Sequence, residues 1–310
     1  MDTRVLVIGE VLIDVVRTPD GRWTEHVGGS PANVATGLAR LRHLTDFATT
    51  FGRDERGADC LAHMKAHGVD VLPSSRTGDP TSVADATLDE TGAATYRFDL
   101  HWNLQRVPIR SGVNHLHTGS IAATEAPGAS MVLSTLVEAR PWSTISYDPN
   151  ARPSIMGDPD AVRGHMEAVI ALSDVVKASE DDIAWLYPDR TVDEVLEQWH
   201  ALGATFTLAT LGAEGVAFRV PRTGDVCRLQ ARVADSALVV DTVGAGDSFM
   251  AGLLSGLLDD GLLGGTDARV ALGVATAEQI RPALERALAT SAVTVQRKGA
   301  YSPTRHELTS

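Results

Sequence analysis

Cysteine, lysine and aromatic residues are all scarce in this chain of 310 residues. The two cysteines, Cys60 and Cys227, lie far apart and do not have the spacing of metal ligands, which favours a reducing compartment such as the cytoplasm. Phe, Trp and Tyr make up only 5% of the residues, so we expect a core built from Ala, Val and Leu. Lysine occurs at three positions, and arginine supplies the other positive charges of the side chains.

Positive charge is also in short supply, since the formal net charge is −13. Nucleic acid is bound by clustered Lys and Arg, so this balance argues against a nucleic-acid partner. An anionic ligand has to be held by a local arrangement of groups, against an unfavourable overall field. The N-terminus lacks the basic start and the cleavage site of a signal peptide, and no uncharged apolar run is long enough to span a membrane. We therefore expect a soluble, cytoplasmic protein without a membrane partner.

The pattern of apolar residues predicts an α/β fold. Two β-branched runs, 5–8 and 11–16, are split by Gly9-Glu10 and predict one buried strand that passes through a kink. From about residue 112 onward, strand-like and helical runs alternate, which predicts a largely parallel sheet with helices on both faces. These runs are 115–120, 130–139, 144–147, 174–177, 192–202 and 206–211. A predicted hairpin, 82–100, does not fit the alternation and indicates a small appendage.

The segment Asp241–Phe249, with the sequence DTVGAGDSF, is the sharpest chemical signal in the chain. Small residues before a helix leave backbone N–H groups free to point at an anion, and the helix dipole adds to the attraction. Asp247 follows these small residues directly, so a proton acceptor is expected beside the bound anion. Phosphoryl transfer to an alcohol requires this combination. The alternative is a glycine-rich turn in which Asp247 only caps the helix.

Two helical stripes follow this segment. They consist of Phe249, Leu253 and Leu257, and of Met250, Leu254 and Leu258.

A second segment, Gly28 to Asn33 (GGSPAN), lies far from the first in the sequence. Its glycines let the backbone approach a ligand, and Asn33 offers both a donor and an acceptor to hydroxyl groups. Asp14 interrupts an apolar run, which is an unusual place for a charge unless it faces a cleft. Asp14 and Asn33 together are the pair of groups expected to bind vicinal hydroxyls of a sugar. Taken alone, the segment is equally well explained as a loop that leads into a helix.

With both segments in view, the chain resembles the ribokinase, or PfkB, family of carbohydrate kinases. Gly28–Ala35 matches the N-terminal signature of that family, and Asp241–Phe249 matches the C-terminal one. Between them, Gly52–Gly57 is similar to the family's G-x-D-x-x-G motif, and Thr210–Gly215 is similar to its nucleotide loop. The four motifs occur in the right order over nearly the whole chain, which makes the resemblance specific.

The resemblance implies a fold, two cofactors and a set of site residues. The fold is ribokinase-like, with a mainly parallel sheet in a large domain (1–14, 28–80 and 111–310) and a small β-sheet lid (15–27 and 81–110). ATP and Mg²⁺ are the implied cofactors. Asp247 is the implied base, assisted by the backbone N–H groups of Gly244, Ala245 and Gly246. The implied sugar-binding residues are Asp14, Gly28, Gly29, Asn33, Asn103 and Arg152. The implied nucleotide-binding residues are Lys177, Ser179, Thr210, Gly212 and Gly215.

The chain departs from the family pattern at the motif that organises magnesium and phosphate. Ser179 replaces an Asn, and Asp182 replaces a Glu, so the carboxylate that would act indirectly on magnesium has a shorter reach. The alternative for these acidic residues is a helix N-terminus enriched in carboxylates. The segments Lys177–Pro188 and Asp148–Pro153 resemble the fructokinase branch. Within the second, Arg152 is a candidate for contact with phosphate or sugar, or belongs to a surface turn built on Asp-Pro-Asn.

A potassium site is a further expectation from the resemblance, because several members of the family are activated by that ion. Its ligands in this chain would be Asp241, Val243, Thr294, Arg297, Gly299 and Ser302. Ser302 lies one place closer to Gly299 than the family pattern requires.

The sequence therefore predicts an ATP-dependent sugar kinase, with D-fructose as the first expected substrate. Another acceptor, such as 2-keto-3-deoxygluconate or ribose, is the alternative within the same class. A sugar-binding sensor without catalysis is an alternative from another class, favoured slightly by the changes at Ser179 and Asp182. A dinucleotide-dependent oxidoreductase is disfavoured, because Gly9-Glu10-Val11 is not a G-x-G-x-x-G turn. A homodimer formed through the lid is the expected assembly.

Overall fold

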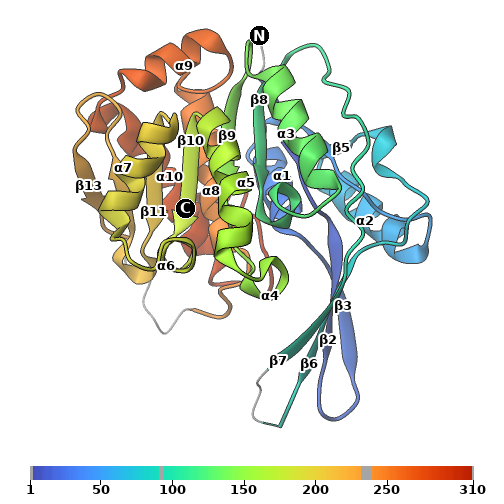
Figure 1. Ribbon diagram of the computed structural model, residues 1–310. Coiled ribbons are helices and arrows are strands. Elements are labelled where there is room, and N and C mark those ends of the chain that lie inside the picture. The colour runs from blue at the N-terminus through green and yellow to red at the C-terminus, as the bar shows by residue number, and fades with distance from the viewer. Residues whose placement is uncertain (1–2, 91–93, 232–238, 309–310) are drawn as a thin grey trace.

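The computed structural model describes residues 3–90, 94–231 and 239–308 and arranges them as two sheets with flanking helices (Figure 1). The large sheet has nine strands. In spatial order they are β13 (Val226–Leu229), β12 (Val216–Arg219), β11 (Phe206–Thr210), β10 (Val175–Ser179), β9 (Thr144–Asp148), β8 (Val113–Gly119), β1 (Arg4–Ile8), β4 (Leu44–Ala48) and β5 (Asp70–Val71). All neighbours from β11 to β5 are parallel, and β12 and β13 are antiparallel. The prediction of a mainly parallel sheet is confirmed.

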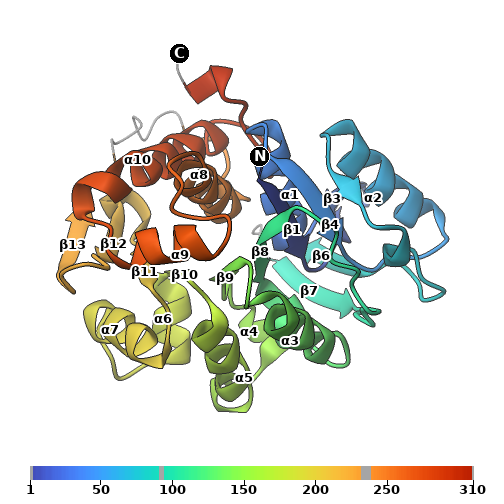
Figure 2. The same ribbon diagram turned by 90° about the horizontal axis from the view of Figure 1, so that it is seen from above.

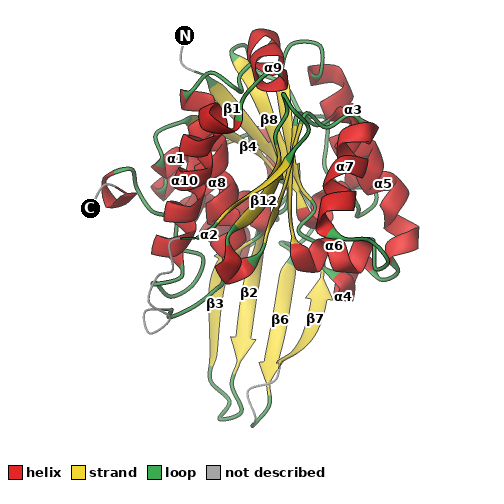
Figure 3. Cartoon of the chain, turned by 90° about the vertical axis from the view of Figure 1, so that its left-hand side faces the viewer, coloured by secondary structure: helices red, strands yellow, loops and turns green. Residues whose placement is uncertain are grey.

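Helices cover both faces of this sheet, as Figures 2 and 3 show. One layer contains α1 (Ser30–Arg40), α2 (Glu55–Ala66), α8 (Ala245–Asp259) and α10 (Ala277–Thr294). The other contains α3 (Gly128–Ala139), α5 (Pro159–Leu172), α6 (Glu180–Leu186) and α7 (Val192–Leu202). The short α4 (Pro153–Met156) lies at one end of this second layer, and α9 (Thr266–Gly273) lies at the other end of the molecule. Among the described helices, none has both the length and the apolar character needed to cross a bilayer.

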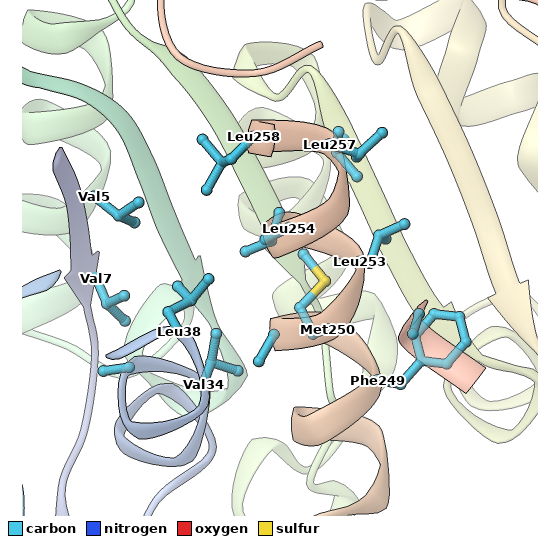
Figure 4. Packing of buried hydrophobic residues seen from close by; sticks show 14 of the residues in the cluster. Val5, Val7, Val34, Leu38, Phe249, Met250, Leu253, Leu254, Leu257 and Leu258 are labelled. Carbon is cyan, nitrogen blue, oxygen red and sulfur yellow. The ribbon is translucent and has the colours of Figure 1, made fainter. Parts of the chain in front are cut away.

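The core follows from this layering. Strands covered on both faces should be continuous apolar runs, and Val5 to Ile8 on β1 are each 1% exposed or less. The α8 helix is the most deeply buried helical element, and both of its predicted stripes are used (Figure 4). Met250, Leu254 and Leu258 face Val34 and Leu38 on α1, while the stripe of Phe249 lies on the other side.

The small sheet projects from one end of the large domain (Figures 1 and 3). Its spatial order is β3 (Trp23–Gly28), β2 (Leu12–Arg17), β6 (Val83–Leu88) and β7 (Ala94–Asp99). The central pair, β2 and β6, is parallel, and the two outer pairs are antiparallel. The predicted hairpin of residues 82–100 is present as β6 and β7, although part of its turn (91–93) lies outside the described residues.

The prediction of a single kinked strand at the N-terminus is wrong. The break at Gly9-Glu10 takes the chain from β1 in the large sheet to β2 in the small one. Both strands are buried, so their apolar pattern is the same as that of one interrupted strand. Gly9 is required at the crossing, because an added Cβ would lie 2.2 Å from Cγ of Pro31.

The small sheet also differs from its expected boundaries. It begins at Leu12, so Asp14 lies on β2 within the small sheet and not in the large domain. The segment 100–110 forms no strand, and Trp102, Leu104 and Val107 are buried in a cluster with residues of the large domain. The Trp102 indole donates to the carbonyl oxygen of Ala122 at 3.0 Å, which makes this ring part of the core.

The G-x-D-x-x-G motif forms a joint between α2 and the small sheet. Asp54 caps α2 by accepting a hydrogen bond from the Gly57 amide at 2.7 Å. The same carboxylate accepts from the amide of Thr81 at 2.9 Å and from its hydroxyl at 2.6 Å, just before β6 begins. An added Cβ at Gly57 would lie 2.2 Å from the carbonyl oxygen of Gly52, so both glycines permit this close approach.

Candidate active site

The candidate site residues gather at the carboxyl ends of the central parallel strands. Asp148 ends β9, Ser179 ends β10 and Thr210 ends β11. Glu10 follows β1 after one glycine. Open parallel sheets bind their ligands at this edge, because the loops that follow the strands converge there.

Asp247 lies at the centre of this group, in the first turn of α8, and is 7% exposed. Its two carboxylate oxygens are held by α1. The Ser30 hydroxyl donates to Oδ1 at 2.7 Å, and the Asn33 side-chain amide donates to Oδ2 at 2.8 Å. The amide of Asn150 lies 3.5 Å from Oδ1. The two signature segments, distant in the sequence, therefore meet at one carboxylate.

The turn before α8 has the geometry of an anion cradle. Gly244 is left-handed, with a φ of 74°, and an added Cβ would lie 2.6 Å from Ala300. The structure differs from the prediction at Ala245, whose amide donates to the Thr242 carbonyl oxygen at 3.2 Å. Gly246 and Asp247 lie at the second and third helical positions, where backbone N–H groups have no partner within the helix.

Two glycines before α1 leave room for Asp14 and for the backbone of Glu10. An added Cβ at Gly28 would lie 2.0 Å from a carboxylate oxygen of Asp14. Gly29 is left-handed, with a φ of 106°, and an added Cβ there would lie 2.5 Å from the Glu10 carbonyl oxygen. A side chain at either position would displace a neighbour that belongs to the site.

Two carboxyl groups of this region, Glu10 and Asp14, are influenced by the charge of Arg152. Burial raises the pKa of Glu10 to about 7 and that of Asp14 to about 6, and the charge of Arg152 opposes both shifts. Oε2 of Glu10 is buried without a hydrogen-bond partner among the described residues. The Arg152 guanidinium donates to the side-chain oxygen of Asn150 at 2.7 Å, so that the nitrogen of this amide is turned toward Asp247. Hydrogen bonds through Asn150 thus connect Arg152 to Asp247.

Lys177 forms a buried ion pair beside the cradle. Its ammonium group lies 2.8 Å from Oδ2 of Asp148 and 3.5 Å from the carbonyl oxygen of Gly246, and it is 4% exposed. Burial by itself lowers the pKa of Lys177, but the attraction of Asp148 outweighs this and raises the pKa above its usual value. The ammonium therefore stays charged at the start of α8.

Ser179 and Asp182 form a capping box at the start of α6. The Ser179 amide and hydroxyl donate to Oδ2 of Asp182 at 2.8 and 2.7 Å, and the Asp182 amide donates back to the hydroxyl at 3.1 Å. The amide of Ala151 donates to the other oxygen, Oδ1, at 2.7 Å. These residues therefore start a helix, and the box also contacts the loop after β9.

A cavity of about 400 Å³ lies on the other side of the cradle. Its walls are the loop after β11, the first turns of α8, and the last turns of α10. Thr210, Gly212 and Gly215 line it, as predicted for the nucleotide loop, and so do Ala245 and Gly246. Gly215 is left-handed, and an added Cβ would lie 2.1 Å from the Leu229 carbonyl oxygen, so only glycine is accommodated.

The predicted potassium ligands are brought together only in part. The Asp241 carboxylate accepts from the amides of Val243 at 3.0 Å and Gly299 at 2.9 Å, which joins the two expected segments. The Arg297 amide donates to the Thr294 carbonyl oxygen at 2.9 Å. Ser302 is tied to α1, because its carbonyl oxygen accepts from Arg40. The expectation that Ser302 is a ligand stays a prediction.

Asn103 is not joined to the base by the structure. Its side chain is exposed, and its oxygens face Gln105, at 3.2 and 3.5 Å. A contact between Asn103 and a sugar stays a prediction.

The comparisons with known proteins identify the family. The model of the pfkB family carbohydrate kinases matches residues 2–307. This chain is a PfkB family carbohydrate kinase.

Curated relatives and solved structures agree with this assignment. The kinase is 31% identical to a fructokinase of Escherichia coli over 324 residues, which covers 100% of this chain and 99% of the relative. It is also 31% identical to a fructokinase of Klebsiella pneumoniae, over 84% of this chain and 87% of the relative. A fructokinase of Xylella fastidiosa with bound ATP superposes with a TM-score of 0.83 at 24% identity, covering 100% of this chain and 98% of the other. A fructokinase double mutant of Vibrio cholerae O395 with fructose, ADP and potassium superposes with a TM-score of 0.82 at 24% identity, covering 99% and 97%. These two likenesses support the fold.

A magnesium ion fits this carbohydrate kinase as a partner of the substrate phosphates. The described residues contain no group of three or more His, Cys, Asp or Glu side chains placed to hold a metal. In kinases, however, magnesium is bound by one or two carboxylates together with phosphates and waters. Oδ1 of Asp148 is buried without a hydrogen-bond partner among the described residues, so it is an oxygen that such an ion could use.

Sequence reasoning missed four residues of the kinase site. Ser30 and Asn150 contact Asp247, and Asp148 pairs with Lys177. All three lie inside motifs that were recognised, next to the residues that were chosen. Glu10 was seen only as a break in an apolar run, and the signal that could have identified it is a carboxylate between two buried strands.

Proposed function

We propose that this carbohydrate kinase transfers the γ-phosphoryl group of ATP to a primary hydroxyl group of D-fructose. The oxygen–phosphorus bond to ADP breaks as the bond to the sugar oxygen forms, and the hydroxyl proton passes to Asp247. The observation that carries the proposal is the position of Asp247. It lies between the cavity lined by the nucleotide loop and the group formed by Asp14 and Arg152.

The relatives support fructose as the acceptor. Several curated proteins that are about as similar to this chain as the relatives above bear the name fructokinase, and the Vibrio cholerae structure holds fructose and ADP. Asp14 and Arg152 give this site both an acceptor and a donor for sugar hydroxyls. Asn33 is the third such group, since its amide oxygen is free of the bond to Asp247.

The residues divide the chemical work. Ser30 and Asn33 hold the Asp247 carboxylate so that it faces the attacking hydroxyl, which favours proton transfer. The amides of Gly246 and Asp247 point to where negative charge develops, and each such donor lowers the barrier by ~3 kcal/mol. Lys177 adds a fixed positive charge at the same place. Magnesium, when bound, neutralises charge on the phosphates.

We propose that the small sheet acts as a lid over the sugar. Asp14 lies on β2, so motion of this sheet brings a sugar-binding carboxylate toward or away from the base. Closure excludes water and so limits hydrolysis of ATP. Small-angle scattering with fructose and a non-hydrolysable ATP analogue together should show compaction. An unchanged radius of gyration would contradict the closure.

The central test is the substitution Asp247→Asn. We expect both substrates to bind and turnover to fall at least ~100-fold, because the general base is lost. Steady-state kinetics and calorimetric binding measure the two quantities separately. Near-normal turnover would reject the role of Asp247.

A panel of acceptors decides which sugar is used. Fructose should be phosphorylated with the highest kcat/KM when ATP and magnesium are supplied. A preference for 2-keto-3-deoxygluconate or ribose would replace fructose with that acceptor, and fructose 6-phosphate belongs in the panel because a 6-phosphofructokinase is 27% identical. Binding without turnover for every sugar would favour the sensor.

Three further parts of the proposal concern potassium, assembly and location. Repeating the assay with and without potassium tests whether the Asp241–Gly299 pair belongs to an activating ion site.

We propose a homodimer formed through the small sheet, on which Trp23 and Tyr96 are more than half exposed. Light scattering measures the mass of the assembly in solution.

Cys60 and Cys227 are both free thiols, which supports a cytoplasmic location.

A further inference from the structure

We propose that Asp182 is a positioning residue that holds the loop 149–152 against Asp247, and that it does not organise magnesium. This inference rests on the proposed function, since it concerns the same site. It assigns to this carboxylate a role that differs from the one implied by the family resemblance.

The hydrogen bonds of Asp182 leave little of it for a metal. Oδ2 accepts from both the amide and the hydroxyl of Ser179, and Oδ1 accepts from the amide of Ala151. The side chain is 9% exposed. Hydrogen bonds from three protein groups on a carboxylate of this burial satisfy most of its capacity to accept. The carboxylate is therefore used to join α6 to the loop after β9.

The loop that it holds reaches the base directly. Asn150 is left-handed, with a φ of 36°, a conformation that residues with a side chain rarely adopt and that needs support from its surroundings. Its side-chain amide lies 3.5 Å from Asp247. Ala151 is the next residue, so the bond to Asp182 fixes the backbone one position away from the strained residue.

Arg152 completes the link to the sugar side. Its guanidinium donates to the Asn150 side-chain oxygen at 2.7 Å and to the carbonyl oxygen of Ala151 at 3.0 Å. Its charge also lowers the pKa of Asp14 and that of Glu10. Release of Ala151 from Asp182 would move Asn150 and Arg152 together. It would disturb the binding of the sugar more than the binding of the phosphates.

The test is Asp182→Asn, with Asp181→Asn as the matched control. Both substitutions remove one negative charge from the first turn of α6, but Asp181 is exposed and outside the capping box. We expect Asp182→Asn to raise the KM for fructose ~10-fold, as for loss of one hydrogen bond to a charged group. The magnesium concentration for half-maximal rate should stay within about twofold of wild type, because a hydrogen-bonded carboxylate is not available to the ion. The control should leave both quantities unchanged.

Two more measurements separate positioning from general damage. The double variant Asp182→Asn with Asn150→Ala should show non-additive effects on kcat/KM, because Asp182 acts through Asn150. Asp182→Glu restores the family residue but not the fit to Ala151, so we expect it to resemble Asp182→Asn. A higher magnesium requirement in Asp182→Asn that Asp182→Glu repairs, with the fructose KM unchanged, would overturn the proposal.

A readout without substrates keeps the inference separate from the proposed function. Amide hydrogen exchange at residues 150–152 of the ligand-free protein should be faster in Asp182→Asn and unchanged in Asp181→Asn. Unchanged exchange in Asp182→Asn would overturn the positioning role of Asp182, whatever the protein phosphorylates. If the wild type phosphorylates no sugar but this exchange difference appears, the proposed function fails and the positioning role of Asp182 stands.

Discussion

Burial sets the behaviour of single carboxylates in the site. Asp247 is buried but receives hydrogen bonds from Ser30 and Asn33, which compensate its charge. Glu10 is equally buried, yet one of its oxygens has no hydrogen-bond partner among the described residues. The two carboxyl groups lie near enough for the charge of Asp247 to raise the pKa of Glu10 further. Glu10 is thus prepared to be neutral, whereas Asp247 is held by hydrogen bonds.

The first prediction at this scale concerns Glu10→Gln and pH. Burial raises the pKa of Glu10 from 4.5 to about 7 in the folded protein, so between these values only the folded form holds the proton. The contribution of Glu10 to the free energy of unfolding is then largest at low pH. It falls as the pH rises, by ~1.4 kcal/mol per pH unit over this window. Gln has no proton to lose. Urea unfolding should therefore show a gain for Glu10→Gln at pH 8, and little gain at pH 4.5. The same difference at both values would contradict the prediction.

The second prediction concerns Asp14→Ala. This change removes a charged hydrogen-bond acceptor for the sugar, worth ~1.5–3 kcal/mol, so the fructose KM should rise ~10-fold or more. The KM for ATP should be unchanged, because Asp14 lies on the small sheet. Asp20→Ala, in the exposed turn of that sheet, is the control. Because the pKa of Asp14 is raised to about 6, the wild-type KM for fructose should also increase as the pH falls below that value. An equal loss of ATP binding would show that Asp14 is misplaced.

At the scale of elements, the base is placed by two helix N-termini. Asp247 belongs to the first turn of α8, and Ser30 and Asn33 belong to the first turn of α1. The N-termini of both helices therefore converge on one carboxylate. The Pro31 ring and the left-handed Gly29 start α1 at this point.

The joint between α2 and the small sheet leads to a third prediction. Asp54→Ala removes the cap of α2, worth ~1 kcal/mol, and the bonds to Thr81, worth about as much again. We expect a loss of ~2 kcal/mol in the free energy of unfolding, measured with urea. Asp59→Ala, exposed on the same helix, should change it by less than ~0.5 kcal/mol. Equal losses in the two variants would show that the joint contributes nothing.

At the scale of the whole molecule, α8 connects the site to the core. Its first turn carries Asp247, and its later turns are buried between α1 and α10 on one face of the large sheet. The cradle is therefore held by the most deeply packed helix of the chain. The small sheet is attached differently, through Asp54 and through an ion pair between Arg56 and Glu25. This contrast fits the proposed motion of the small sheet relative to the turn before α8.

The fourth prediction tests this role of α8. Leu254 is 0% exposed and lies opposite Leu38. Leu254→Ala should lower the free energy of unfolding by ~2–5 kcal/mol, because it leaves a cavity that the neighbouring helices cannot fill. Val270→Ala, on an exposed position of α9, should change it by less than ~0.5 kcal/mol. A loss of stability that does not exceed the control would contradict the packing described for α8.

Local features were predictable from the sequence because their causes are local. The alternation of runs, the two stripes of α8 and the small residues before Asp247 each depend on neighbours within one element. The kink at Gly9-Glu10 was misjudged, since two buried strands in different sheets have the same pattern as one. The boundaries of the small sheet failed for a related reason. The segment around Trp102 mixes apolar and polar residues, and its contacts with Ala122 and the core cluster show that it belongs to the large domain.

The sequence by itself determined the class of chemistry, because an anion cradle and a carboxylate adjoin in one short segment. Only the tertiary structure decided the partners of that carboxylate. Ser30, Asn33 and Asn150 reach Asp247 from segments that are 97 to 217 positions away, and Asp182 holds the loop that carries one of them. Such contacts depend on the order of β10, β9, β8 and β1 in the sheet. No pattern within a single segment contains that order.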